Sequence, residues 1–85
     1  MTREIEIRLF GAFRQVDPGG RITVAVAEDA RVADLRRALA ERLEGHDNAL
    51  SLLESSAFAT DSAVLDEADA LPGRELSILP PVCGG

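Results

Sequence analysis

Two stretches near the N-terminus alternate apolar and polar residues, so that aliphatic side chains fall on one face of each stretch. Residues 4–10 and residues 21–27 follow this pattern, which is typical of half-buried β-strands. The aliphatic positions are Ile5, Ile7, Leu9, Ile22, Val24 and Val26. Residues 17–20 between them read Asp-Pro-Gly-Gly, a strong turn signal. The pattern therefore predicts a hairpin with a long connecting loop.

An amphipathic helix is predicted after this hairpin. Its apolar residues recur at the spacing of one helix face. They are Val32, Leu35, Leu39 and Leu43. Gly45 is suited to end the helix. Its start is poorly capped, because Arg31 stands where Ser or Thr would serve better, and we expect nearby Glu28 and Asp29 to compensate electrostatically. The apolar run at residues 49–53 is compatible with a further short helix, but the sequence does not decide its assignment.

Short strands complete the pattern. Residues 57–60 and 64–65 have strand-like composition, and residues 75–79 alternate again. A hairpin, one helix and a returning strand that pairs in parallel with the first strand make an α+β fold of the β-grasp (ubiquitin-like) type. We therefore expect residues 1–79 to form a mixed sheet of about four to five strands with one main helix on one face and a partly free opposite face.

The last six residues, 80–85, are predicted to form an extended, flexible tail. They read Pro-Pro-Val-Cys-Gly-Gly. Pro80 and Pro81 favour an extended conformation, and Gly84 and Gly85 have no side chains to block a narrow channel. Fully extended, the tail spans roughly 20 Å. It is suited to deliver its C-terminal carboxylate into another protein's active site for activation, for instance as an acyl-adenylate; the alternative is a frayed, inert end.

Composition narrows the classes of partner. The chain of 85 residues is one small domain with a net charge of −6, which argues against nucleic acids and anionic membranes and favours a partner with a basic face. All nine cationic residues are arginines, so no side chain can accept an isopeptide bond. The single cysteine excludes an internal disulfide, and no apolar leader or membrane span is recognisable. We expect a cytoplasmic location.

The chain resembles the ubiquitin-like sulfur carriers, the family of the molybdopterin synthase small subunit and the thiamine-pathway carrier. The resemblance covers essentially the whole chain and is most specific in the Pro-Pro-Val-x-Gly-Gly ending, which is similar to that of the molybdopterin synthase subunit. Residues 9–14 (Leu-Phe-Gly-Ala-Phe-Arg), residues 32–36 (Val-Ala-Asp-Leu-Arg) and Gly73 before Glu75 also match the family pattern.

Four positions depart from that pattern. Arg31, Thr60 and Arg74 replace a capping Thr, an Asn and an acidic turn residue, and these changes concern local stability. Cys83 replaces a small residue beside the reactive end. It is a possible reactive thiol that forms a disulfide with a partner or traps the acyl group. The alternative is a tolerated small residue, because an exposed thiol on an acidic protein carries little thiolate at neutral pH.

The resemblance implies a mechanism centred on Gly85. A partner activating enzyme uses ATP and Mg²⁺ to adenylate the Gly85 carboxylate, and sulfur from a donor replaces AMP to give a thiocarboxylate. The carrier then gives this sulfur to the large subunit of molybdopterin synthase or to another sulfur-accepting enzyme. On this interpretation the protein is not an enzyme on its own and holds no cofactor or metal.

Several residues are candidates for partner contact. Gly84 shapes the tail beside the acyl site, and docking is expected at Leu79, Phe58, Pro80, Pro81 and Val82. Phe58 is equally suited to the core. Arg14 is suited to bind a partner's carboxylate or phosphate, or is a solvated surface residue. His46, the only histidine, and the acidic cluster Asp66, Glu67 and Asp69 are expected in solvated loops without a metal or catalytic role.

Other functions remain open at this point. The same sulfur chemistry serves pathways to cysteine, thiamine or sulfur-containing secondary metabolites. A free diglycine end also suits a ubiquitin-like modifier that is conjugated through Gly85 to lysines of other proteins. A binding domain with an inert tail is the last alternative.

Overall fold

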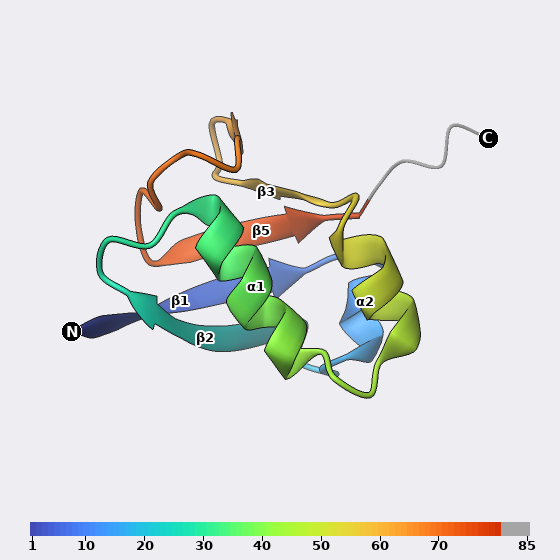
Figure 1. Cartoon of the computed structure of the whole chain (residues 1–85). Coiled ribbons are helices and arrows are strands. Elements are labelled where there is room, and N and C mark those ends of the chain that lie inside the picture. The colour runs from blue at the N-terminus through green and yellow to red at the C-terminus, as the bar shows by residue number, and fades with distance from the viewer. Residues whose placement is uncertain (81–85) are drawn as a thin grey trace.

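The computed structural model describes residues 1–80. The predicted tail residues 81–85 lie outside the described residues. The elements in chain order (Figure 1) are strand β1 (Thr2–Leu9), the 3₁₀ helix η1 (Gly11–Gln15), strand β2 (Arg21–Ala27), helices α1 (Val32–Arg42) and α2 (Asp47–Leu53), and strands β3 (Ala57–Ala59), β4 (Val64–Leu65) and β5 (Glu75–Leu79).

The five strands form one mixed sheet in the order β2-β1-β5-β3-β4. Strands β1 and β2 pair antiparallel, as the predicted hairpin requires, with Ile5 opposite Val24. Strand β5 returns parallel to β1, with Leu76 opposite Ile7, and pairs antiparallel with β3 on its other side. The predicted α+β fold of the β-grasp type, including its parallel central pair, is therefore confirmed.

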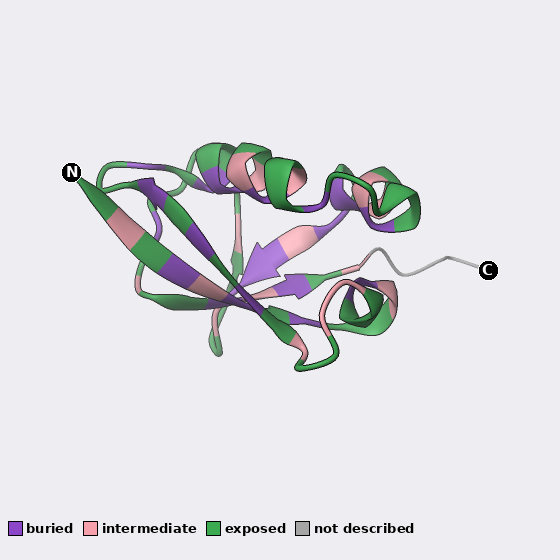
Figure 2. Ribbon diagram, turned by 90° about the horizontal axis from the view of Figure 1, so that it is seen from below, coloured by how far each residue is buried: buried purple, intermediate pink, exposed green. Residues whose placement is uncertain are grey.

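The core lies between the sheet and the helices. Helix α1 crosses one face of the sheet (Figure 1), and along the strands buried residues alternate with more exposed ones (Figure 2). All the aliphatic positions predicted to face inward are buried, and η1 adds Phe13. Burying one such side chain stabilises the fold by about 1.5–3 kcal/mol relative to leaving it in water. The aliphatic side chains that recur every second residue in the strands and at helical spacing in α1 therefore face a common interior.

The start of α1 is capped by the loop that precedes β5. The backbone N–H groups of Val32 and Ala33 donate to the carbonyls of Asp69 and Glu67, at 3.0 and 3.1 Å. The guanidinium of Arg31 reaches the same loop and donates to the Ala68 carbonyl at 2.9 Å. These bonds satisfy first-turn donors that a Ser or Thr side chain satisfies in other helices. The start of α1 is therefore capped by a distant loop in addition to the local bond from the Arg31 N–H to Oδ2 of Asp34, at 2.9 Å.

A short second helix accompanies the one main helix that the sequence predicted. Helix α2 occupies the segment whose assignment the sequence left open, and it buries Ala49 and Leu53 against the core. The Ser56 hydroxyl donates to the Leu52 carbonyl at 2.6 Å just beyond the helix. Helix α2 lies beside α1 on the same side of the sheet (Figure 1). Within residues 1–80, no helix is long and apolar enough to cross a bilayer.

Candidate functional site

The strand that leads into the tail lies in the middle of the sheet. Strand β5 pairs with β1 through Ile78 opposite Leu9 and with β3 through Leu79 opposite Ala57. A strand paired on both sides resists local fraying, because each departure breaks bonds to two neighbours. The chain therefore enters the tail from a rigid support, which fixes the position of Pro80.

Gly11 makes room for Pro80. Its φ of +59° lies in the left-handed region, which L-residues adopt at a cost. A Cβ at this position would lie 2.9 Å from Cγ of Pro80, closer than van der Waals contact allows. We call Gly11, Leu79 and Pro80 the tail base. The sequence contained Gly11 in a family-like segment, but nothing in it indicated contact with a residue at the far end of the chain.

Apolar side chains are exposed around the tail base. Leu79 is 36% exposed, and Phe10 beside Gly11 is 42% exposed. Because Leu76 and Ile78 face the core, Ser77 and Leu79 lie on the opposite, open face of the sheet. The open face therefore carries an exposed leucine where the chain leaves the sheet, as the predicted docking role of Leu79 requires. That role itself stays a prediction.

Charged residues of β1, β2 and β5 also lie on the open face. Arg8 pairs with Glu75 at 2.8 Å, and Arg21 pairs with Glu6 at 3.1 Å. Arg14 is exposed and lines a hollow of about 430 Å³ together with these two arginines. Among the described residues it forms no ion pair. Contact of Arg14 with a partner's carboxylate or phosphate stays a prediction, and a solvated surface residue stays the alternative.

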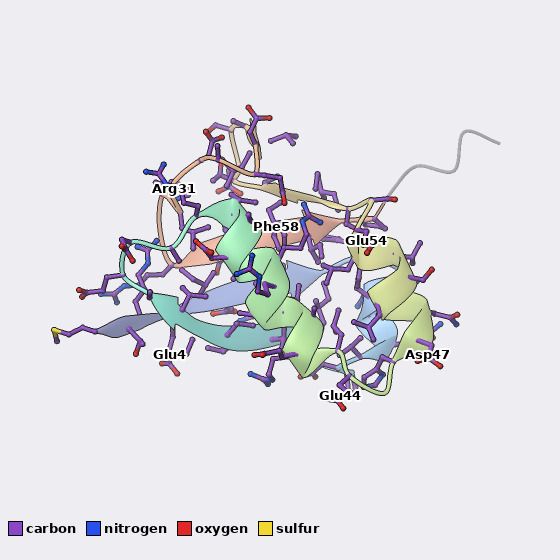
Figure 3. The ribbon with its side chains drawn as sticks, viewed as in Figure 1. Glu4, Arg31, Glu44, Asp47, Glu54 and Phe58 are labelled. Atoms are coloured by element: carbon purple, nitrogen blue, oxygen red, sulfur yellow. The ribbon has the colours of Figure 1, made fainter. Side chains whose placement is uncertain are left out.

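Phe58 belongs to the core, so its proposed place on a docking face is wrong. The side chain is 0% exposed, because its position in β3 puts it on the same sheet face as Ile78. Figure 3 labels the residue. The Arg36 guanidinium lies 5.1 Å from the centre of the Phe58 ring, within the range of a cation–π interaction. Phe58 supports the strand next to β5 and has no surface for a partner.

Arg36 also orders the acidic loop. Its Nε and Nη2 atoms donate to the two carboxylate oxygens of Glu67, at 2.9 and 2.7 Å, and its Nη1 donates to the Leu53 carbonyl. The hydrogen bond from Arg36 lowers the pKa of Glu67; burial opposes this, and the charge of Arg36 adds to the lowering. In the loop that we predicted to be solvated, the Glu67 carboxylate therefore forms a structural contact with Arg36.

No metal centre is found within residues 1–80, where no group of three or more potential ligands comes together. His46 directly precedes α2, and its side chain forms no hydrogen bond that caps this helix. The remaining predicted site residues, Pro81, Val82, Cys83, Gly84 and Gly85, lie outside the described residues. Their predicted roles are therefore still predictions.

Comparison with known proteins gives one family and two similar structures. The model of the ThiS family matches residues 7–85. The crystal structure of SAMP1 from Haloferax volcanii is similar with 28% identity and a TM-score of 0.68, covering 98% of this chain and 100% of that one. The solution structure of the Haloferax volcanii HVO 2177 protein has 32% identity and a TM-score of 0.68, covering 99% of this chain and 88% of that one. No curated protein matches.

Proposed function

Because this chain belongs to the ThiS family of ubiquitin-like proteins, we propose that it is a protein sulfur carrier whose Gly85 carboxylate becomes a thiocarboxylate. The family supports the coarser description of a ubiquitin-like sulfur carrier or modifier. The more specific role that we propose is that of the small subunit of molybdopterin synthase, in the cytoplasm. The carrier supplies sulfur there and is not itself the catalyst.

The observation that supports this proposal is the tail base. A carrier has to present a narrow, reactive end at a reproducible place, and Pro80 follows the central strand and lies against Gly11. The exposed Leu79 beside it gives a partner an apolar contact next to the entering tail. The family match includes the terminal Gly84 and Gly85.

The chemistry requires an activated carboxylate. In the partner activating enzyme, with Mg²⁺, a carboxylate oxygen of Gly85 attacks the α-phosphorus of ATP, and pyrophosphate leaves. A sulfur nucleophile supplied by the donor then attacks the acyl carbon, and AMP leaves. Glycine suits both steps because it does not hinder attack and has no stereocentre to racemise. In the active site of the large subunit, the thiocarboxylate sulfur attacks the acceptor molecule. Water then hydrolyses the bond between this sulfur and the acyl carbon, which leaves the sulfur on the acceptor and returns Gly85 to a carboxylate.

Intact-mass spectrometry tests the proposal. The protein is isolated from its own cells without reductant or acid, and also after incubation with ATP, the activating enzyme and a sulfur donor. We expect a species heavier by the exchange of one oxygen for sulfur, which fragmentation localises to Gly85. A variant that lacks Gly84 and Gly85 is the control. An unmodified mass after the complete incubation would contradict the carrier role.

A pull-down distinguishes the pathway. Binding to the cognate large subunit of molybdopterin synthase, reduced by Leu79→Lys, is the expected result. If another biosynthetic enzyme binds instead, the sulfur chemistry stands and the molybdopterin assignment is wrong. Replacing Cys83 with Ser in the same assays separates a functional thiol from a tolerated one.

Conjugation to other proteins is the second candidate function. The similarity to SAMP1, a small archaeal modifier protein, favours it. A modifier would form tail-dependent conjugates on lysines of other proteins in cells, and it would form none on its own side chains because it has no lysine. A set of heavier conjugate bands that disappears when Gly84 and Gly85 are deleted would support this function. The absence of any conjugate would rule it out.

A further inference from the structure

Strand β2 has an unpaired edge. It is one of the two outer strands of the sheet, and within residues 1–80 its only strand partner is β1. The Gly20 carbonyl accepts from the Leu9 N–H, and the Glu28 N–H donates to the Met1 carbonyl. The even-numbered residues of β2 therefore direct their backbone groups toward β1. The odd-numbered residues direct theirs away from the sheet.

Two outward carbonyls of this edge have partners, and the position between them is open. The Arg42 guanidinium donates to the carbonyl of Thr23, and the Ala30 N–H donates to the carbonyl of Ala27 at 3.0 Å. Between them, both outward backbone groups of Ala25 lack a partner among residues 1–80. Blocked positions on an edge prevent long strand pairing between copies. The open position between the two engaged carbonyls still admits one short added strand.

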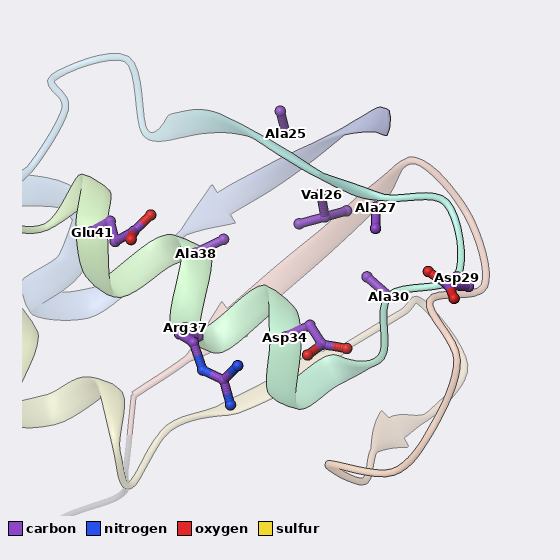
Figure 4. Close-up of a pocket in the computed structure, with 9 residues that line it drawn as sticks. All are labelled: Ala25, Val26, Ala27, Asp29, Ala30, Asp34, Arg37, Ala38 and Glu41. Atoms are coloured by element: carbon purple, nitrogen blue, oxygen red, sulfur yellow. The ribbon is translucent and has the colours of Figure 1, made fainter. Parts of the chain in front are cut away.

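A groove runs beside this open position, between β2 and α1 (Figure 4). It encloses about 400 Å³. Ala27 from the strand and Ala38 from the helix line it, and Val26 and Ala30 add further apolar atoms. Ala25 borders it, with its methyl group pointing away from α1 (Figure 4). Small residues leave space that larger side chains would fill. The groove can therefore hold one apolar side chain of medium size.

The rim of the groove is acidic. Asp34 and Glu41 project from α1 on either side of Ala38, and Asp29 lies beyond the end of β2, whereas Arg37 points away from the strand (Figure 4). Asp34 and Glu41 are separated along the helix by about 10 Å. In an extended peptide, residues two positions before and two positions after a central residue lie about 13 Å apart. Long basic side chains at these positions would reach both carboxylates.

We propose that β2 and this groove bind an extended peptide segment of a partner protein, which adds a strand through Ala25, inserts one apolar side chain and places basic residues two positions before and after it. Added strands gain affinity from backbone bonds and specificity from alternate side chains. The proposal is independent of sulfur transfer. Strand β1 separates β2 from β5, so a peptide on β2 leaves the tail base accessible.

The probe is the peptide acetyl-Gly-Ser-Lys-Thr-Val-Thr-Lys-Ser-Gly-amide, titrated into the full chain labelled with nitrogen-15. We expect the largest amide shifts at Ala25 and its neighbours in β2, together with slower hydrogen exchange of the Ala25 amide. A peptide with glutamates in place of both lysines should bind at least about tenfold more weakly, because the charge contacts become repulsive.

Two charge reversals form a matched pair of variants. Glu41→Lys places a positive charge at the groove, whereas Glu44→Lys makes the same change in net charge beyond the end of α1, outside the groove (Figure 3). We expect Glu41→Lys to weaken binding about fivefold to tenfold and Glu44→Lys less than twofold. Ala38→Leu, which fills the groove and keeps a good helix former, should weaken binding at least as much as Glu41→Lys.

Three results would overturn the proposal. The first is equal binding by the Glu41→Lys and Glu44→Lys variants, both shown to be folded by circular dichroism. The second is a set of shifts confined to the open face or the tail base. The third is a dimer in sedimentation experiments that uses the β2 edge and excludes the peptide.

Discussion

Replacing Gly11 with alanine perturbs the tail base at a single point. The substitution adds one methyl group in a left-handed conformation, with φ at +59°, and places it 2.9 Å from Cγ of Pro80. Carbon atoms at optimal separation lie about 3.5–4.0 Å apart. Pro80 must therefore move by about half an ångström or more, while the rest of the sheet can remain in place.

Gly20→Ala is the matched control. Gly20 also has a positive φ, of +73°, but an added Cβ would meet only Nε of Arg14, at 3.9 Å, an ordinary contact. Both variants should lose about 1–2 kcal/mol from the left-handed backbone. That loss corresponds to a fall in Tm of about 4–8 °C per kcal/mol for a domain of this size. Any further loss of stability in Gly11→Ala, beyond this shared cost, comes from the contact with Pro80.

The assay is ATP–pyrophosphate exchange with the activating enzyme, measured well below the Tm of both variants. A misplacement of about 1 Å costs on the order of a hundredfold in rate, so we expect Gly11→Ala to lose about tenfold in kcat/KM. Gly20→Ala should stay within about twofold of the unmodified protein, because its tail base is intact. If Gly11→Ala is as stable as Gly20→Ala and is adenylated at the same rate, the contact between Gly11 and Pro80 does not position the tail.

Three further substitutions test the rest of the structure. Phe58→Ala should lower the free energy of unfolding by about 3–5 kcal/mol in urea titrations, because it empties a buried site; a loss below about 1 kcal/mol would contradict the core assignment. Glu67→Gln should cost about 0.2–1 kcal/mol at pH 7, since the pair with Arg36 is partly exposed and screened. The folded-state pKa of Glu67 is lowered from its ordinary value of 4.5. The difference in the free energy of unfolding between the unmodified protein and Glu67→Gln should therefore shrink as the pH falls below 4.5 and vanish below the folded-state pKa. A difference that persists there would contradict the role of the ion pair. Leu79→Lys should reduce kcat/KM for adenylation about tenfold. Val64→Lys introduces the same charge in the outermost strand β4 and should change kcat/KM less than twofold. Equal effects of the two substitutions would contradict the docking role of Leu79.

Periodicity in the sequence was enough to predict the sheet. The alternation at residues 21–27 and 75–79 gave the bounds of β2 and β5 without error, because in these strands every second side chain is buried. The parallel pairing of β1 with β5 followed from one covering helix and a short chain, which leave few alternatives. The spacing of Leu35 and Leu39 identified the buried face of α1, because residues four positions apart lie on the same side of a helix.

Contacts between distant loops could not be predicted from periodicity. Part of the cap of α1 consists of backbone carbonyls near Ala68, far along the chain, so Arg31 looked like a defect in the sequence. The burial of Phe58 depended on the register of a strand with only three residues. Gly11 had no local signal for contact with Pro80, because an αL glycine after a strand is common for many reasons. Each of these features depends on residues that only the folded chain brings together.

The same long-range contacts connect the core to the proposed chemistry. Strand β3 holds one side of β5, and Phe58 attaches β3 to the interior below the Arg36 guanidinium. Loosening this region would leave the residues of the tail unchanged and still alter the place from which the tail departs. Core variants that remain folded should therefore lose activation in proportion to the hydrogen-exchange protection that they lose in β5, because a tail positions its end only as well as its support is ordered. Loss of activation in a variant with full protection of β5 would instead locate the defect at the partner surface.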